Sequence, residues 1–225
     1  INSLNFKNLV IYSMKKFILD LLRNTFPRFF LFLKFQYLKR KPSDINEHLE
    51  TLSKYASSCN SIFETGVRGV VSSWALLHGI SKNGSNIKTF VMNDIEMINT
   101  SSIRKVMDKL NIDGEFIKGN NLDLNLKQNF ELIFIDTLHV YGQLKRELEK
   151  FSKVATKYII LHDTTVDADK GEVVRLGLDI ETIIQQTNFE KAEIVKGLWP
   201  AVDEFLNSNE DWSLQKRYVN SNGLT

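Results

Sequence analysis

"FETGVRGVVSSWALLHGI", residues 63–80, is the stretch that decides the fold class of this chain. An apolar strand ends in the acid Glu64, Gly66 and Gly69 supply a tight turn, and a helix follows with Ser72 in its first turn. Glycines let a ligand approach the backbone closely, and the unpaired N–H groups at a helix start attract an anion. The stretch therefore predicts the first strand, turn and helix of an α/β protein that binds a ligand at the turn.

The acid before the turn narrows the class of ligand. Glu64 would repel a pyrophosphate, but it suits a ligand with an ammonium and a carboxylate, such as the amino-acid end of S-adenosylmethionine. The next apolar run, "IKTFVMNDIE", places Asp94 at a strand end, where a carboxylate can accept both hydroxyls of an adenosine ribose. Asn120 follows the third predicted strand, where its amide could contact adenine; a role in a loop turn is the alternative for this residue.

The rest of the chain alternates short apolar runs with helical stretches, which is typical of a mostly parallel sheet covered by helices. Two of the runs, 132–135 and 158–161, are apolar without alternation, as expected for strands that are buried on both faces. Leu144, Leu148 and Phe151 mark one face of a crossover helix between them. The predicted strands are 61–64, 87–93, 115–118, 131–135, 157–161 and 212–219.

Polar side chains follow the fourth and fifth predicted strands directly. Asp136 and His139 come after one strand, and His162 and Asp163 come after its neighbour. Because adjacent strands lie roughly 4.8 Å apart, these four groups should converge on one pocket. Burying four polar groups at the ends of apolar strands is costly unless they bind something.

Two kinds of chemistry are open at this cluster. A histidine has the unperturbed pKa nearest to neutral, so His139 or His162 is a candidate general base, with Asp163 beside them. Alternatively, Asp136 and Asp163 could hold a divalent ion such as Mg²⁺ that lowers the pKa of an acceptor hydroxyl. A purely structural role also stays open, because the function of Asp136 could be no more than to cap the following helix.

The first 41 residues differ from the rest of the chain. They carry nine Lys or Arg and one acid, a net charge of +8, while the remaining residues carry 20 basic and 26 acidic groups, a net charge of −6. Their longest apolar run, 29–33, is far shorter than the roughly 18 residues of a membrane-spanning helix. We therefore predict a basic, aromatic-rich helical segment at 1–41 and a domain at 42–225. The segment could pack on the body, cap a ligand site, contact a second copy, or lie on an anionic membrane.

Composition excludes several other classes. Cys59 is the only cysteine, so an internal disulfide or a thiolate metal cluster is excluded, and a reducing, cytoplasmic location is expected. The basic residues do not form a recognised nucleic-acid reading motif, so no nucleic-acid partner is expected.

The segment 42–58 begins with Pro42 and a helix-capping pattern, Asp44 followed by Glu47, which predicts the start of the domain.

Taken in order, "FETGVRGVVSS", "VMNDIE", "FIKGN", "LIFIDTLHVYG", "YIILHDTT", "WPAVDEF" and "NSNGLT" resemble class I S-adenosylmethionine-dependent methyltransferases. The resemblance spans 44–225 and is to the branch of cephalosporin-hydroxylase-like and macrocin-type O-methyltransferases. It implies a doubly wound, Rossmann-like α/β sheet of seven strands whose last strand is antiparallel. It also implies cofactor contacts at Glu64, Gly66, Ser72, Asp94 and Asp136.

The chain departs from the family pattern at two places. The second glycine of the family's turn falls at Val70, with Gly69 one position early, and His162 stands where relatives often have a carboxylate or amide metal ligand. The family's final strand would begin near Thr225, so the last strand is expected to be missing or short.

The predicted function is an S-adenosylmethionine-dependent O-methyltransferase that acts on a hydroxyl of a small molecule or glycan. The alternatives are a nicotinamide oxidoreductase, which the missing GxGxxG turn disfavours, and a scaffold that binds the cofactor without turnover. A homo-oligomer and a peripheral membrane contact through 1–41 are further expectations.

Overall fold

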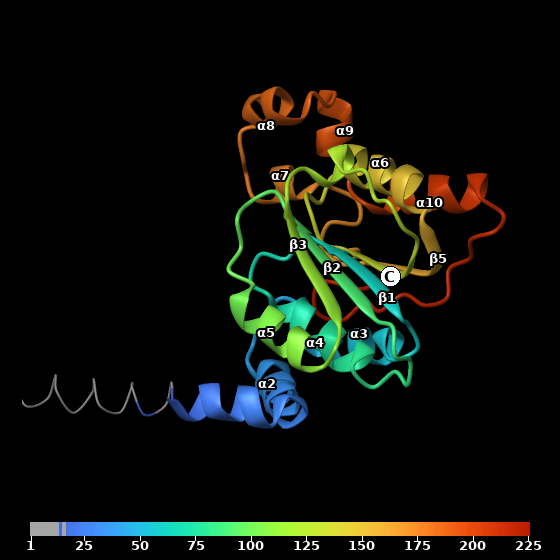
Figure 1. Cartoon of the computed structure of the whole chain (residues 1–225). Helices are drawn as coiled ribbons and strands as arrows, with labels where there is room; N and C mark the ends of the chain where they lie inside the picture. Colours follow the sequence, from blue (N-terminus) through green and yellow to red (C-terminus); the bar gives the residue numbers. More distant parts are fainter. Residues whose placement is uncertain (1–13, 15–16) are drawn as a thin grey trace, which may run out of the picture.

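The computed structural model describes residue 14 and residues 17–225. At its centre is a parallel sheet of five strands in the order β3-β2-β1-β4-β5 (Figure 1). The strands are β1 Ser61–Thr65, β2 Thr89–Asp94, β3 Asp113–Lys118, β4 Phe130–Ile135 and β5 Ala155–Leu161. Five of the six predicted strands are therefore confirmed, and the α/β, Rossmann-like fold class is correct.

Helices cover both faces of the sheet, as Figure 1 shows. One face packs against α3 Leu49–Ala56, α4 Val71–Ile80 and α5 Ser101–Lys109, and the other packs against α6 Tyr141–Phe151 and α10 Trp199–Ser208. The remaining elements are α2 Pro27–Arg40, α7 Glu172–Arg175, α8 Ile180–Thr187, α9 Lys191–Val195, and the short 3-10 helices η1 Asn46–His48 and η2 Asn121–Asp123.

Strand side chains alternate between the two hydrophobic layers. In β1, Ile62 faces the layer of α3, α4 and α5, whereas Phe63 faces the layer of α6 and α10. Glu64 follows Ile62 in this alternation and so lies on the α4 side, while Thr65 lies on the α6 side. All of these side chains are completely or almost completely buried, which explains the lack of polar alternation in the sequence.

The order of the strands fixes where a ligand can bind. The chain moves outward from β1 through β2 to β3 and then returns to β4, which pairs with β1 in the register Thr65↔Ile135. Ligands of open parallel sheets bind at this reversal, beyond the carboxyl ends of the strands. The ends of β1 and β4 therefore mark the candidate site.

The predicted strand 212–219 is wrong. This segment is extended but unpaired, except for a single antiparallel bridge between Tyr218 and Leu224. The end of the chain contributes instead, because Thr225 exchanges two backbone hydrogen bonds with Leu161, of 2.7 and 2.9 Å. The sheet thus gains only a short antiparallel pair at its β5 edge.

The predicted domain start is helical but not capped as expected. η1 leads into α3, and Ile45, the residue before η1, makes no side-chain cap. The carboxylate of Asp44 instead pairs with Arg68 at 2.9 Å. His48 and His78, which lie on η1 and α4, are buried.

α2 lies outside the layer formed by α3, α4 and α5, on the side away from the sheet (Figure 1). It buries Phe30, Leu31, Phe35 and Leu38, and Phe35 stacks on His78 with ring centroids 3.9 Å apart. The rest of the predicted segment 1–41 falls partly outside the described residues, at 1–13 and 15–16. Within the described part of the chain, no helix is long and apolar enough to cross a membrane.

Candidate functional site

Glu64 lies beneath the turn that leaves β1, with 0% of its surface exposed. Ser72 donates a hydrogen bond of 2.5 Å to its Oε1, while Oε2 has no partner among the described residues. Burial, together with the charges of Asp136 and Asp94, raises the pKa of Glu64 to about 8, against the opposing hydrogen bond from Ser72. Glu64 is therefore a buried acid with free capacity for one donor.

The turn after β1 has a backbone shape that suits glycine at three positions. Gly66, Arg68 and Val70 have φ angles of +88°, +31° and +58°, which lie in the left-handed region. Gly69 is not among the residues of positive φ, so it does not provide the turn as predicted. Val70 adopts a conformation that is unusual for a β-branched residue, so this turn is strained.

Gly66, which follows β1, packs against the backbone that follows β4, at the point where the strand order reverses. A Cβ atom at this position would lie 1.7 Å from the backbone oxygen of Asp136. Only glycine allows so close an approach between the chain segments that leave the carboxyl ends of β1 and β4, which we call the exits of these strands. The predicted role of Gly66 as the turn residue is thus explained by steric contact as well as by φ.

Asp94 lies at the end of β2, where the sequence predicts a ribose contact. Both carboxylate oxygens accept backbone hydrogen bonds, Oδ2 from the N–H of Arg68 at 2.8 Å and Oδ1 from the N–H of Glu96 at 2.9 Å. Neither Glu64 nor Asp94 forms a salt bridge with any described residue. Among the residues that the structure describes, the ends of β1 and β2 therefore hold two acids and no compensating cation.

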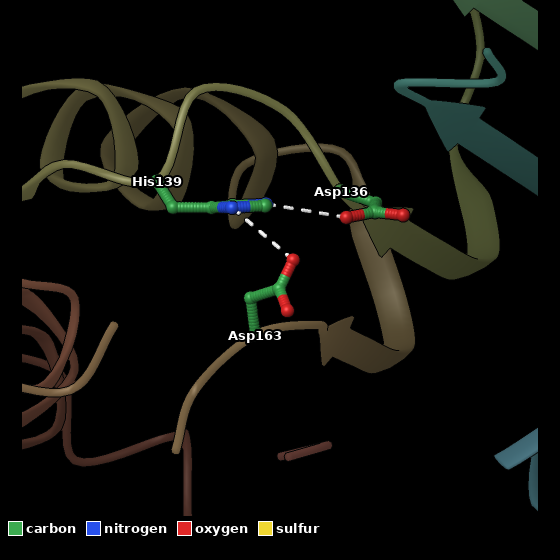
Figure 2. Close-up of side chains that lie close together, drawn as sticks. All are labelled: Asp136, His139 and Asp163. Carbon is green, nitrogen blue, oxygen red and sulfur yellow. Dashed lines mark hydrogen bonds and ion pairs between the residues drawn. The ribbon is translucent and has the colours of Figure 1, made fainter. Parts of the chain in front are cut away.

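The exits of β4 and β5 bring together the four polar residues that the sequence singled out. Figure 2 shows the His139 ring between the carboxylates of Asp136 and Asp163, with Nε2 3.2 Å from Asp136 Oδ1 and Nδ1 3.1 Å from Asp163 Oδ2. His162 Nδ1 lies 3.2 Å from Asp136 Oδ1 and 3.3 Å from Asp163 Oδ2. The predicted convergence is confirmed, and Asp136 is not a helix cap, because α6 has no side-chain cap.

Two further carboxylates, which the sequence did not single out, face His139. Its Nδ1 lies 3.4 Å from Asp167 Oδ2 and 3.3 Å from Glu172 Oε2. Burial lowers the pKa of His139, but the carboxylates of Asp136, Asp167 and Glu172 outweigh it, so its pKa lies well above the usual value. These carboxylates therefore favour the protonated form of the imidazole.

Neighbouring charges also outweigh burial at His162 and Asp136. Burial lowers the pKa of His162, but the carboxylates of Asp136 and Asp163 raise it by more, so that its pKa is about 9. Burial raises the pKa of Asp136, but the two imidazoles hold it well below its usual range. Asp163 has a left-handed φ of +57°, and its Oδ1 has no hydrogen-bond partner among the described residues. That oxygen is the free acceptor of the cluster.

The cluster has a donor set that fits a divalent cation. One ligand atom each from Asp136, His139 and Asp163 lies within 4.8 Å of the others, as does a second set of His139, Asp167 and Glu172. The second set is partly committed elsewhere, because Arg175 binds both oxygens of Asp167 at 2.6 and 2.9 Å. The imidazole among the ligands disfavours the predicted Mg²⁺, which takes oxygen ligands.

The asparagines after β3 lie in different settings. Asn120 is exposed and accepts a hydrogen bond from the N–H of Leu122, which is the loop-turn role. Asn121 is buried, and its amide donates to Thr65 and Glu147. The predicted contact of Asn120 with adenine stays a prediction.

Glu147 is the centre of a buried polar network that was not predicted from the sequence. Its Oε1 accepts hydrogen bonds from Thr137, Asn121 and Gln143, and burial raises its pKa. Glu147 shares the face of α6 that carries Leu144, Leu148 and Phe151, so an acid on an apolar helix face was the available signal. The network binds the exits of β1 and β4 together from the α6 side.

Two cavities lie near these strands. A small one of about 10 Å³, room for about one water, is lined by His139, His162, Thr137 and Glu147 among others. A groove of about 580 Å³ runs along β5 beside the C-terminal segment. Glu64 is completely buried and Asp94 is 8% exposed, so neither acid is open to a ligand in this conformation.

Solved structures share this architecture. An N-methyltransferase, NodS from Bradyrhizobium japonicum WM9, in complex with S-adenosyl-L-homocysteine, is 12% identical, with coverage of 86% of this chain and 94% of that chain and a TM-score of 0.50. The S-adenosylhomocysteine-bound methyltransferase PaMTH1 from Podospora anserina is 13% identical, with coverage of 100% and 94% and the same TM-score. This chain has a methyltransferase fold. No protein-family model matches the sequence, and no curated protein matches it.

Proposed function

We propose that this chain is an S-adenosylmethionine-dependent O-methyltransferase that acts on a hydroxyl of a small molecule or glycan, of the cephalosporin-hydroxylase-like and macrocin-type branch. One observation carries the proposal: the adjacent strands β1 and β2 end in two buried acids, Glu64 and Asp94, without a cation among the described residues. A ligand that brings positive charge and ribose hydroxyls satisfies both. S-adenosylmethionine has an ammonium, a sulfonium and a ribose.

The same observation disfavours a nicotinamide dinucleotide. Its pyrophosphate would lie at the turn after β1, where Glu64 and Asp94 add negative charge and Arg68 turns its guanidinium to Asp44. The α4 N-terminus offers N–H groups, but it begins behind the bulky Val70 instead of a glycine. The oxidoreductase reading therefore lacks a compensating cation.

Binding at Glu64 requires the turn 66–70 to move, since the Glu64 side chain is completely buried. The left-handed φ of Arg68 and Val70 makes the closed turn strained, and this strain reduces the cost of opening it. We propose that Glu64, Gly66, Ser72, Asp94 and Asp136 contact the bound cofactor, with Gly69 and Asn120 at its edge.

Methyl transfer from a sulfonium to a hydroxyl is a direct displacement, so the protein must align the acceptor and remove its proton. Asp163 Oδ1 is the free acceptor atom at the exits of β4 and β5. We propose that the acceptor hydroxyl donates to this oxygen, while His139 and His162 hold the carboxylates in place from the other side. This moves the role of base from the histidines to Asp163.

A divalent cation at Asp136 and Asp163 would lower the pKa of an acceptor hydroxyl when bound. Ligand atoms of Asp136, His139 and Asp163 lie within 4.8 Å of one another, which supports such a site. His139 would then be the third ligand, and His162 would orient the two carboxylates. Mg²⁺ and Mn²⁺ are the ions to compare.

Calorimetry with S-adenosylhomocysteine and with NAD⁺, each with and without MnCl₂ or MgCl₂, tests the cofactor. We expect binding of S-adenosylhomocysteine and none of NAD⁺. Transfer of a labelled methyl group to a panel of sugars and phenols then tests turnover, which Asp163→Asn should abolish without loss of cofactor affinity. Binding of NAD⁺ alone would refute the proposal, and cofactor binding without methyl loss on any acceptor would favour the scaffold reading. A cytoplasmic location remains part of the proposal.

A further inference from the structure

α2 is apolar on both sides, although only one side packs against the protein. Its buried side contains Phe30, Leu31, Phe35 and Leu38. Its opposite side exposes five large apolar residues to 42–60% of their surface, namely Phe26, Phe29, Phe32, Leu33 and Tyr37. A row of large apolar side chains that is exposed on a helix marks an interaction surface, so this face calls for a partner.

The exposed residues form one continuous stripe. Phe29, Leu33 and Tyr37 recur at helical spacing, and Phe26 and Phe32 extend the stripe at its margins. The helical residues 17–25 that precede α2 add Phe17, Ile18, Leu19 and Leu21, each at least half exposed. We name the exposed apolar residues of 17–37 the apolar stripe.

The charge around the apolar stripe is strongly positive. Residues 17–41 carry six Lys or Arg and one acid, a net charge of +5, and that acid, Asp20, is paired with Arg23 at 2.6 Å. Of the other cations, Lys39 pairs with Glu50, whereas Arg28, Arg40 and Lys41 form no salt bridge with a described residue. Arg40 and Lys41 lie at the C-terminal end of α2, whereas Arg28, at its N-terminal end, donates a hydrogen bond of 3.0 Å to the backbone oxygen of Ser81.

We infer that the apolar stripe docks on an anionic lipid surface. Aromatic and aliphatic side chains enter the boundary between headgroups and acyl chains, while the flanking Arg and Lys bind the acidic headgroups. A second copy of this chain fits less well, because a two-fold contact through this face would bring +5 against +5. This inference does not depend on the proposed methyl transfer, since α2 lies outside the α3–α5 layer and takes no part in the site (Figure 1).

Flotation with vesicles tests the inference on the full chain. We expect binding to vesicles of phosphatidylcholine with phosphatidylglycerol, weak binding to phosphatidylcholine alone, and release at about 1 M salt, where the Debye length falls to ~3 Å. Each Lys or Arg near an anionic surface contributes about fivefold to affinity. Arg40→Glu with Lys41→Glu should therefore weaken binding by about 25-fold or more.

Phe29→Gln with Phe32→Gln and Leu33→Gln should abolish flotation, because these residues are exposed and their replacement leaves the packed side intact. A matched control replaces three exposed apolar residues elsewhere, Ile87→Gln with Leu176→Gln and Val219→Gln, and should float as the parent does. Thermal melting of each variant establishes that it is folded.

Sedimentation velocity of the full chain without lipid completes the test. We expect a monomer or an oligomer that the Phe29, Phe32 and Leu33 variant does not alter. A dimer that this variant dissociates, together with absent flotation of the parent chain, would overturn the inference in favour of self-association. Equal flotation on neutral and anionic vesicles would also overturn it.

Discussion

The two halves of the candidate site balance charge in opposite ways. At the exits of β4 and β5, two imidazoles lie between the carboxylates of Asp136 and Asp163, so acids and bases compensate one another. At the exits of β1 and β2, Glu64 and Asp94 have no cation among the described residues. The charges of the first half are balanced without a ligand, whereas the second half must either hold a proton or bind a positive charge.

This difference shows where the positively charged part of a ligand belongs. Burial of an uncompensated acid is costly, and Glu64 reduces the cost by keeping its proton, as its pKa of about 8 indicates. An ammonium group would remove the need for that proton. The contrast between the halves therefore predicts a cation beside β1 and an acceptor hydroxyl beside β5.

The largest effect should come from the residue that joins the halves. Gly66→Ala would place a Cβ 1.7 Å from the backbone oxygen of Asp136 at a φ of +88°, and we expect a loss of about 4 kcal/mol or more in the free energy of unfolding. Gly69→Ala is the matched control, since its nearest contact would be 3.6 Å away, and we expect a change within about 1 kcal/mol. Urea unfolding of both variants measures this.

If Gly66→Ala were as stable as Gly69→Ala, the close approach of the two exits would not exist in solution. The two halves of the candidate site would then not adjoin.

A smaller effect should appear in the pH dependence of stability. The pKa of Glu64 is raised from 4.5 to about 8 on folding, so the folded chain binds more protons between these values. The stabilising contribution is therefore complete below pH 4.5 and is lost as pH rises toward 8, with a slope of at most about 1.4 kcal/mol per pH unit. Urea unfolding between pH 5 and pH 8 measures the slope.

Glu64→Gln should flatten that slope, because glutamine has the shape of the protonated acid and does not titrate. Glu96→Gln, a nearby exposed acid, is the control and should leave the slope unchanged. Equal slopes for all three proteins would mean that Glu64 is ionised in the folded chain.

The sequence predicted the strands of the sheet and the cluster at the ends of β4 and β5, because both follow from patterns within short stretches of the chain. Five strands were found from apolar runs, and the convergence of Asp136, His139, His162 and Asp163 followed from the geometry of adjacent parallel strands. The strand expected at 212–219 was wrong, since an apolar and aromatic segment does not reveal whether a partner strand is present.

Long-range contacts explain the other omissions. Asp167 reaches His139 from the irregular segment after β5, and Glu172 reaches it from the first residue of the short helix α7, and no periodicity predicts either path. The left-handed φ of Arg68 and Val70 could not be read from residues that normally avoid it. The closure of the turn over Glu64 depends on the whole packed structure.

The most direct test of the central claim is calorimetry of S-adenosylhomocysteine binding at pH 7, in two buffers with different ionisation enthalpies. Because Glu64 holds a proton in the free chain and would lose it to pair with the ligand's ammonium, we predict the release of close to one proton per bound ligand. The parent chain should show this release, and Glu64→Gln should not. Binding with the same enthalpy in both buffers, or equal proton release by both proteins, would contradict the claim that Glu64 receives the positive charge.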